Sequence, residues 1–153
     1  MPRATSVNDP NFKPQIGIYS YASTAQKSLA GQFEFDVSQF RDPQGQKQFF
    51  GRDICGIDAE VRDWVGQDRR VPVLIKECRL LAEDLIRPKQ TGVTNGVTQE
   101  KAPCQWLSIS FKDFHGKWIA PAVAELVANA LSDDGFTITV YHSGTKQAAA
   151  VAR

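Results

Sequence analysis

Four short segments of the chain alternate between hydrophobic and polar residues, and this alternation predicts β-strands. The segments are 15–21 (QIGIYSY), 32–37 (QFEFDV), 106–111 (WLSISF) and 136–141 (FTITVY). β-branched and aromatic side chains dominate them, as is typical of strands. The clearest case is 32–37, where Phe33, Phe35 and Val37 alternate with polar residues. We expect 106–111 to be the central strand.

A helical period of three to four residues recurs in three further segments. The first helix is predicted to begin after Asp58 as its N-cap and to end at Gly66, with Val61, Trp64 and Val65 on one face. The second covers 71–86 and stops before Pro88. Its apolar stripe consists of Leu74, Cys78, Leu81 and Leu85. The third covers 119–131, after the polar loop 112–117.

The predicted elements follow the order β, β, α, α, β, α, β, which indicates an α/β domain. The last three form a β–α–β unit, for which we expect a parallel pair of strands and a right-handed crossover. We therefore predict a layered domain with a mixed, partly parallel sheet flanked by helices. Segment 89–103 contains Gly92, Asn95 and Gly96 and is predicted to be a mobile loop or an irregular hairpin.

The ends of the chain predict one domain with two tails. Residues 1–14 are polar and contain proline, so we expect a flexible N-terminal arm, and the Ala-rich segment 144–153 predicts a flexible C-terminal tail. The α/β domain then spans 15–143, and 153 residues suit a single core. The N-terminus lacks an apolar signal segment, and no apolar run approaches about 18 residues, so we expect a soluble, cytoplasmic protein without a membrane span.

Charge and cysteine content narrow the classes of function. Lys and Arg number 18 against 17 Asp and Glu, which excludes a uniformly basic nucleic-acid binder and an acidic disordered chain. The three cysteines, Cys55, Cys78 and Cys104, are too widely spaced for a disulfide framework or a paired zinc motif. Free thiols fit a reducing cytosol. We expect no metal and no cofactor.

The loop 112–117 (KDFHGK) is the strongest candidate for chemistry because it leads from a buried strand into a helix. Helix N-termini attract anions through unpaired N–H groups, and Lys112, His115 and Lys117 would add positive charge. The alternative is an ordinary solvated loop. Asp113 and His115 would suit a general acid/base pair of a hydrolase, but two residues are a weak signal. We therefore predict binding rather than catalysis.

Several short motifs occur in a particular order along residues 15–143. They are the strand 16–21, Phe35-Asp36-Val37 with Asp42-Pro43 soon after, Gly56-Ile57-Asp58-Ala59-Glu60-Val61, Ala124-Glu125, and His142 after the last strand. In this order they resemble the C-terminal domain of the RNase adapter protein RapZ and its stand-alone relatives. The family's nucleotide-binding half has no counterpart in this sequence.

The loop departs from the family pattern. The family has a loop similar to Gly-Cys-Thr-Gly-Gly-x-His-Arg-Ser, whereas this chain has Trp118, Ile119 and Ala120 at the His, Arg and Ser positions. Ser38 stands where the family has an Arg after Asp-Val. His115, Gly116 and Lys117 would be a shifted substitute for the anion site.

The resemblance implies a non-enzymatic binding or adapter protein for RNA or a phosphorylated small ligand such as an amino-sugar phosphate. The ligand-binding residues would be Lys112, His115, Gly116, Lys117 and His142. RNA would contact Arg69, Arg70, Lys112 and Lys117, with Lys47 and Arg52 as further candidates. The family also self-associates, which implies a possible homo-oligomer. The alternative is a protein–protein interaction factor that keeps the fold and has lost the ancestral pocket.

Overall fold

The structure of the chain is a computed structural model that describes residues 15–24, 31–86, 90–94, 97–100, 106–143 and 151–152. The predicted arm 1–14 and the thiol of Cys104 lie outside these residues. Of the predicted tail 144–153, the structure describes the short strand β7 (Val151–Ala152) alone. The flexibility of both tails stays a prediction.

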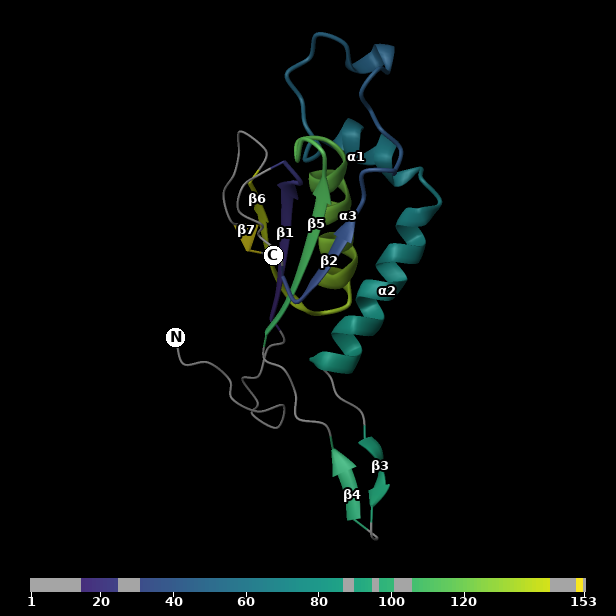
Figure 1. Ribbon diagram of the computed structural model, residues 1–153, viewed down its shortest axis with the longest axis vertical. Helices are drawn as coiled ribbons and strands as arrows, with labels where there is room; N and C mark the ends of the chain where they lie inside the picture. Colours follow the sequence, from purple (N-terminus) through teal and green to yellow (C-terminus); the bar gives the residue numbers. More distant parts are fainter. Residues whose placement is uncertain are drawn as a thin grey trace.

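A five-stranded sheet forms the centre of the fold (Figure 1). Its parallel strands are β1 (Gln15–Ala22), β2 (Phe33–Asp36), β5 (Trp106–Asp113) and β6 (Thr137–His142). The spatial order is β2-β5-β1-β6-β7, and β7 pairs antiparallel with β6. The prediction of a layered α/β domain with a mixed, partly parallel sheet is confirmed.

Two details of the sheet correct the sequence predictions. Strands β5 and β6 run parallel but do not pair, because β1 lies between them and pairs Ile18 with Ile109 on one side and Val140 on the other. Strand β5 also continues through Asp113, so the expected loop 112–117 begins later than predicted. Lys112 is therefore a strand residue.

The helices lie close to their predicted positions. They are α1 (Ala59–Gly66), α2 (Arg70–Leu85) and α3 (Ile119–Asp133), with a 3-10 turn η1 (Lys47–Phe49) before them. Helix α3 contacts strands β1, β5 and β6, while α1 and α2 pack against α3 (Figure 1). Because α3 lies between the sheet and the other helices, it is buried on most of its surface.

Segment 89–103 contains the hairpin that was one of its two predicted alternatives. Strands β3 (Gln90–Thr94) and β4 (Val97–Glu100) pair antiparallel, and their register shifts between Gln90 and Gly92. They form a two-stranded sheet separate from the main one.

The core lies on the α3 side of the main sheet. Successive strand residues point to opposite faces, so Ile18 of β1, Ile109 of β5 and Val140 of β6 share one buried face. The neighbouring positions face the other way. There Tyr21 donates a hydrogen bond to Glu34, and the Lys112 Nζ lies 3.1 Å from the same carboxylate.

Candidate functional site

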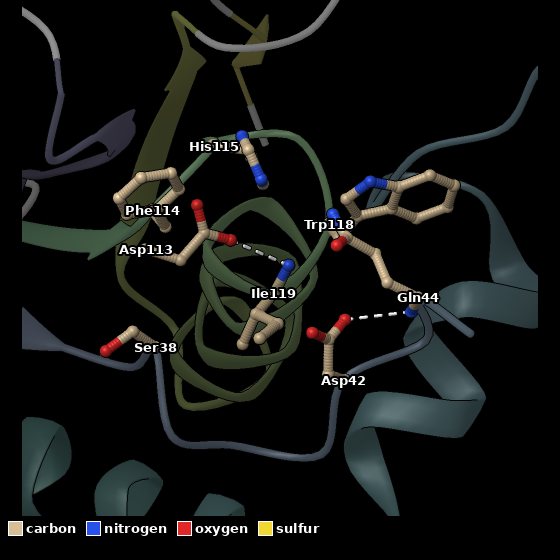
Figure 2. A pocket seen from close by; sticks show the side chains of 8 residues that line it. All are labelled: Ser38, Asp42, Gln44, Asp113, Phe114, His115, Trp118 and Ile119. Atoms are coloured by element: carbon tan, nitrogen blue, oxygen red, sulfur yellow. Dashed lines mark hydrogen bonds between the residues drawn. The ribbon is translucent and has the colours of Figure 1, made fainter. Parts of the chain in front are cut away.

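A cavity of about 170 Å³ lies at the carboxyl end of the parallel sheet, where α/β proteins commonly bind ligands (Figure 2). One wall comes from the segment after β2 and consists of Ser38, Asp42 and Gln44. The opposite wall comes from the β5–α3 junction and consists of Asp113, Phe114, His115, Trp118 and Ile119. The predicted loop 112–117 thus contributes three of the eight lining residues, Asp113, Phe114 and His115.

Asp113 caps the N-terminus of α3. Its Oδ2 accepts hydrogen bonds from the backbone N–H groups of Ile119 (2.9 Å) and Ala120 (2.8 Å), and its Oδ1 accepts one from Gly116. Asp113 is buried, with 4% of the residue exposed. The N–H groups that would attract an anion are therefore occupied by a carboxylate of the chain itself. The same bonds engage the oxygens that a hydrolase would use as a general base.

Gly116 allows the loop to adopt its backbone conformation. It has a φ of 69°, in the left-handed region that favours glycine. A Cβ there would also lie 2.5 Å from the backbone nitrogen of Ala22, at the end of β1. The loop is therefore held against the sheet, and the structure gives Gly116 a packing role.

The motif that begins at Gly56 holds the loop from the other side. The N–H of Gly56 donates to the carbonyl of Lys117 at 2.8 Å, and a Cβ at Gly56 would lie 2.2 Å from the carbonyl oxygen of Trp118. Asp58 is the N-cap of α1, as predicted, and accepts a hydrogen bond from the N–H of Cys55. The motif thus supports the cavity wall.

The two lysines that were predicted to bind a ligand, Lys112 and Lys117, do not line the cavity. Lys112 points to the face opposite α3, and its hydrogen bond and charge interaction with Glu34 raise its pKa. The pKa of Glu34 is lowered by the hydrogen bond from Tyr21 and by Lys112. The Nζ of Lys117 lies 5.0 Å from the centre of the Trp118 ring, a cation–π contact. Of the five predicted ligand residues, which the structure describes in full, His115 is the one in the lining.

His142 lies in a buried polar network instead. Its Nδ1 is 2.6 Å from the Ser20 Oγ, and its Nε2 is 3.3 Å from the Glu125 Oε1. All three residues are nearly inaccessible to solvent. The network joins β1, β6 and α3, and it explains why the sequence places a glutamate on the buried helix.

The four residues predicted to bind RNA lie on different sides of the sheet. Arg69 is exposed beside the start of α2, whereas Lys112 lies on the face opposite the helices. Arg70 makes a bidentate ion pair with Asp68, at 3.0 Å from its Nε and 2.7 Å from its Nη2. These hydrogen bonds hold the pKa of Asp68 well below its usual range. The structure therefore does not assemble one basic face from these residues.

Sequence reasoning missed one wall of the cavity. Asp42 was noticed as part of the Asp42-Pro43 motif and not as a lining residue, and Gln44 belongs to no motif. Pro43 and Gly45 mark a turn, in which the Asp42 carboxylate accepts a hydrogen bond from the N–H of Gln44. Turn signals show that the chain reverses but not what it folds back against. Ser38 attracted notice as a departure from a family pattern and not as a lining residue.

The described ranges also bear on metal binding and on membrane insertion. Across them, no three His, Cys, Asp or Glu side chains gather closely enough to hold a metal ion. No helix among the same residues combines the length and hydropathy needed to cross a bilayer. Cys55 and Cys78 are free thiols.

Comparison with known proteins places the chain in no family. No protein-family model matches it, and no curated protein is significantly similar to it. The resemblance to the RapZ family stays a prediction from the order of short motifs. Fold and site together define the chain as an α/β domain with a small, partly aromatic cavity at the carboxyl edge of its sheet.

Proposed function

We propose that the chain is a non-enzymatic binding protein that takes a small ligand in the cavity beside loop 112–117. The cavity itself is the observation that carries the proposal, because it joins two segments distant in sequence at the edge where such domains bind ligands. Asp113, Gly116 and Gly56 fix the β5–α3 wall, so the wall is formed before any ligand arrives. A preformed wall reduces the ordering cost of binding.

The lining indicates the chemistry of the ligand. Ser38, Gln44 and Asp42 supply polar groups for hydroxyls, while Phe114 and Trp118 supply aromatic surface. Among the described residues that line the cavity there are two carboxylates, Asp42 and Asp113, and no lysine or arginine. A phosphate inside the cavity would meet like charge, so we propose that an uncharged, hydroxyl-rich part of the ligand enters. At roughly 30 Å³ per water, the cavity of about 170 Å³ holds about six waters, which suits part of a small molecule.

A thermal-shift titration tests this site with named probes. The probes are glucose, glucose 6-phosphate and inorganic phosphate, each taken to millimolar concentration. We expect the hexoses to raise the melting temperature by mass action, and Ser38→Leu, which fills the cavity, to abolish the shift. Ser132→Leu, near the far end of α3, is the matched control and keeps it. No shift with either hexose, or a shift that Ser38→Leu leaves intact, contradicts the proposal.

RNA binding is tested separately by an electrophoretic shift with a structured RNA at low salt. Binding through phosphates weakens steeply as salt is added. Since Lys112 is paired with Glu34, we expect little binding. Salt-sensitive binding that the double substitution Lys112→Ala and Lys117→Ala removes would favour RNA as the ligand instead.

The second candidate function is that of a protein–protein interaction factor. The observation that favours it is Phe114, which lines the cavity and is nevertheless 61% exposed. Exposed aromatic side chains are enriched in protein interfaces. A protein captured from cell extract by the wild-type chain but lost with Phe114→Ser, with no thermal shift from the hexoses, would favour this candidate.

A further inference from the structure

Trp64 stands at the edge of the apolar face of helix α1. Val61 and Val65 on the same helix are fully buried in the core, and α1 packs against α3. At about 100° per residue, Trp64 points about 100° away from Val65 around the helix axis. It is partly buried, and its indole meets the segment that follows β2.

Three residues of that segment contact the Trp64 indole. Its Nε1–H donates a hydrogen bond to the backbone carbonyl of Asp42 at 3.1 Å. The central carbon of the Arg41 guanidinium lies 3.6 Å from the ring centre, a cation–π contact. The Phe49 ring meets the indole edge to face, with 6.2 Å between the ring centres. Segment 41–49 is therefore folded around this one side chain.

The same segment carries one wall of the cavity, since Asp42 and Gln44 are lining residues. Residues 37–46, between β2 and η1, contain no helix or strand, so side chains from elsewhere hold this stretch in place. Asp68 accepts the N–H of Arg41, and Trp64 binds the carbonyl of Asp42 itself. The bond from Trp64 is exposed to solvent. Water can therefore replace it at small cost to stability, but only the indole fixes where Asp42 lies.

The opposite wall is attached to the same short stretch of chain. The N–H of Gly56 donates to the carbonyl of Lys117, next to the lining residue Trp118, and α1 begins three residues after Gly56. Residues 56–64 thus connect both walls, although Trp64 itself is outside the lining. We infer that Trp64 is a positioning residue, which acts through Asp42 to set the spacing of the walls and the affinity of the cavity. This inference rests on the proposed function, because it concerns the same site.

A glucose titration of the full chain, followed by NMR chemical shifts, tests the effect on binding. Trp64→Phe keeps an aromatic ring on α1 but removes the Nε1–H donor. We expect the Kd for glucose to rise by about fivefold, the worth of one neutral hydrogen bond. Trp106→Phe is the matched control, because it makes the same change at the start of β5, whereas the cavity lies at the carboxyl end of the sheet. Equal Kd values for the wild type and Trp64→Phe overturn the inference.

Amide order parameters from NMR relaxation report on the wall without any ligand. In Trp64→Phe, the values for Asp42 and Gln44 should fall toward the flexible range below about 0.6, while those at the start of α3 stay near about 0.85. Unchanged order at Asp42 and Gln44 overturns the inference whether or not glucose binds. If the wild type binds no glucose, the proposed function fails, and the order parameters still decide whether Trp64 positions the wall.

Urea unfolding separates positioning from loss of the fold. Trp64→Phe and Trp106→Phe should unfold at similar urea concentrations, because the bond that Trp64 loses is exposed. Arg41→Ala is a second variant that leaves α1 unchanged and removes the cation–π contact. It should also lower the order parameter of Asp42. A rigid Asp42 in both Arg41→Ala and Trp64→Phe would show that other contacts hold the wall, and would overturn the inference.

Discussion

Two buried carboxylates near the cavity, those of Asp113 and Asp68, each accept hydrogen bonds from several backbone N–H groups. Asp113 binds those at the start of α3, and Asp68 accepts the N–H of Arg41 at 2.8 Å, next to the lining residue Asp42. Asp68 also accepts the N–H of Arg70 at 2.8 Å, at the start of α2. Unpaired N–H groups in such places cost free energy, so these two side chains maintain both walls.

Removing the Asp113 carboxylate should destabilise the fold strongly. Asp113→Ala leaves the N–H groups of Ile119 and Ala120 buried without their acceptor, and each such loss costs about 1–3 kcal/mol. We expect the free energy of unfolding in urea to fall by about 3 kcal/mol. Asp113→Asn keeps an amide oxygen as acceptor and should lose less. A change in Asp113→Ala below about 0.5 kcal/mol would contradict the capping role.

The stabilisation from Asp68 should depend on pH. Arg70 lowers the pKa of Asp68 in the folded chain, whereas an unfolded aspartate titrates near 3.9. The contribution is therefore fully present above the unfolded value and is lost as pH falls toward the folded value. In urea unfolding at pH 7, Asp68→Asn should lower the free energy of unfolding by about 1.5 kcal/mol.

The difference between wild type and Asp68→Asn should shrink below pH 4. Glu60→Gln is the matched control, because Glu60 pairs with Arg52 on the exposed surface and solvent screens that pair. It should change stability little at either pH. A wild-type advantage that stays constant down to pH 3 would show that charge at Asp68 is not responsible.

At the scale of elements, local periodicity in the sequence predicted where the strands and helices lie. Strand β1 and helix α2 were placed to within a residue or two, because alternation and helical spacing reflect which face is buried. The neighbours of each strand were not predictable in this way. β1 became the centre of the sheet because pairing depends on how the crossovers fold, and no local pattern records that.

For the candidate site, too, the sequence predicted the position but not how distant segments meet there. The carboxyl edge near loop 112–117 was predictable from the order of strand and helix, and a cavity lies there. The role of Lys112 was not predictable. Strand β5 includes Lys112, so its side chain lies on the same face as Ser110, away from α3. The meeting of Asp42 and Gln44 with that edge depends on tertiary folding of the segment after β2.

Packing of α2 on the core should protect the Cys78 thiol. Burial raises the pKa of Cys78 to about 12, so almost no thiolate forms in the folded chain at pH 8. In a variant with Cys55→Ser and Cys104→Ser, Cys78 should react with a thiol reagent at the rate at which the chain unfolds. Reaction should become fast in urea.

The same raised pKa predicts alkaline destabilisation through Cys78. An unfolded thiol ionises near pH 8.5, and the folded chain holds the thiol neutral until much higher pH. Stability should therefore decline as pH rises above about 8.5, and Cys78→Ala should reduce this decline. Rapid labelling of native Cys78 at pH 8 would show instead that α2 opens without global unfolding.

At the scale of the whole molecule, the cavity and helix α2 lie on separate surfaces. The cavity lies at the carboxyl edge of the sheet, while α2 packs on the outer side of α3 (Figure 1). No residue of α2 is among the described residues that line the cavity. Substitutions on the exposed side of α2 should therefore leave the lining of the cavity in place.

Gly56 lies just before α1 and packs against the start of α3, so its replacement should disturb both the fold and the cavity. A Cβ at this position would lie 2.2 Å from the carbonyl oxygen of Trp118 and 2.6 Å from the backbone nitrogen of Ala122. Backbone atoms cannot rotate aside, so the start of α3 must move away. We expect Gly56→Ala to lower the free energy of unfolding by about 1–3 kcal/mol, as overpacking typically does.

Gly66→Ala is the matched control for Gly56→Ala, since it makes the same change within α1. A Cβ at Gly66 would meet the Leu126 Cδ1 at 3.5 Å, an ordinary contact, and alanine favours a helix over glycine by up to about 1 kcal/mol. Gly66→Ala should therefore be neutral or stabilising in urea unfolding. Because Trp118 lines the cavity, Gly56→Ala should also weaken any hexose-induced thermal shift, while Gly66→Ala preserves it. Equal stability of the two variants would show that α3 tolerates displacement at its N-terminus, and that the cavity wall is not held by the motif at Gly56.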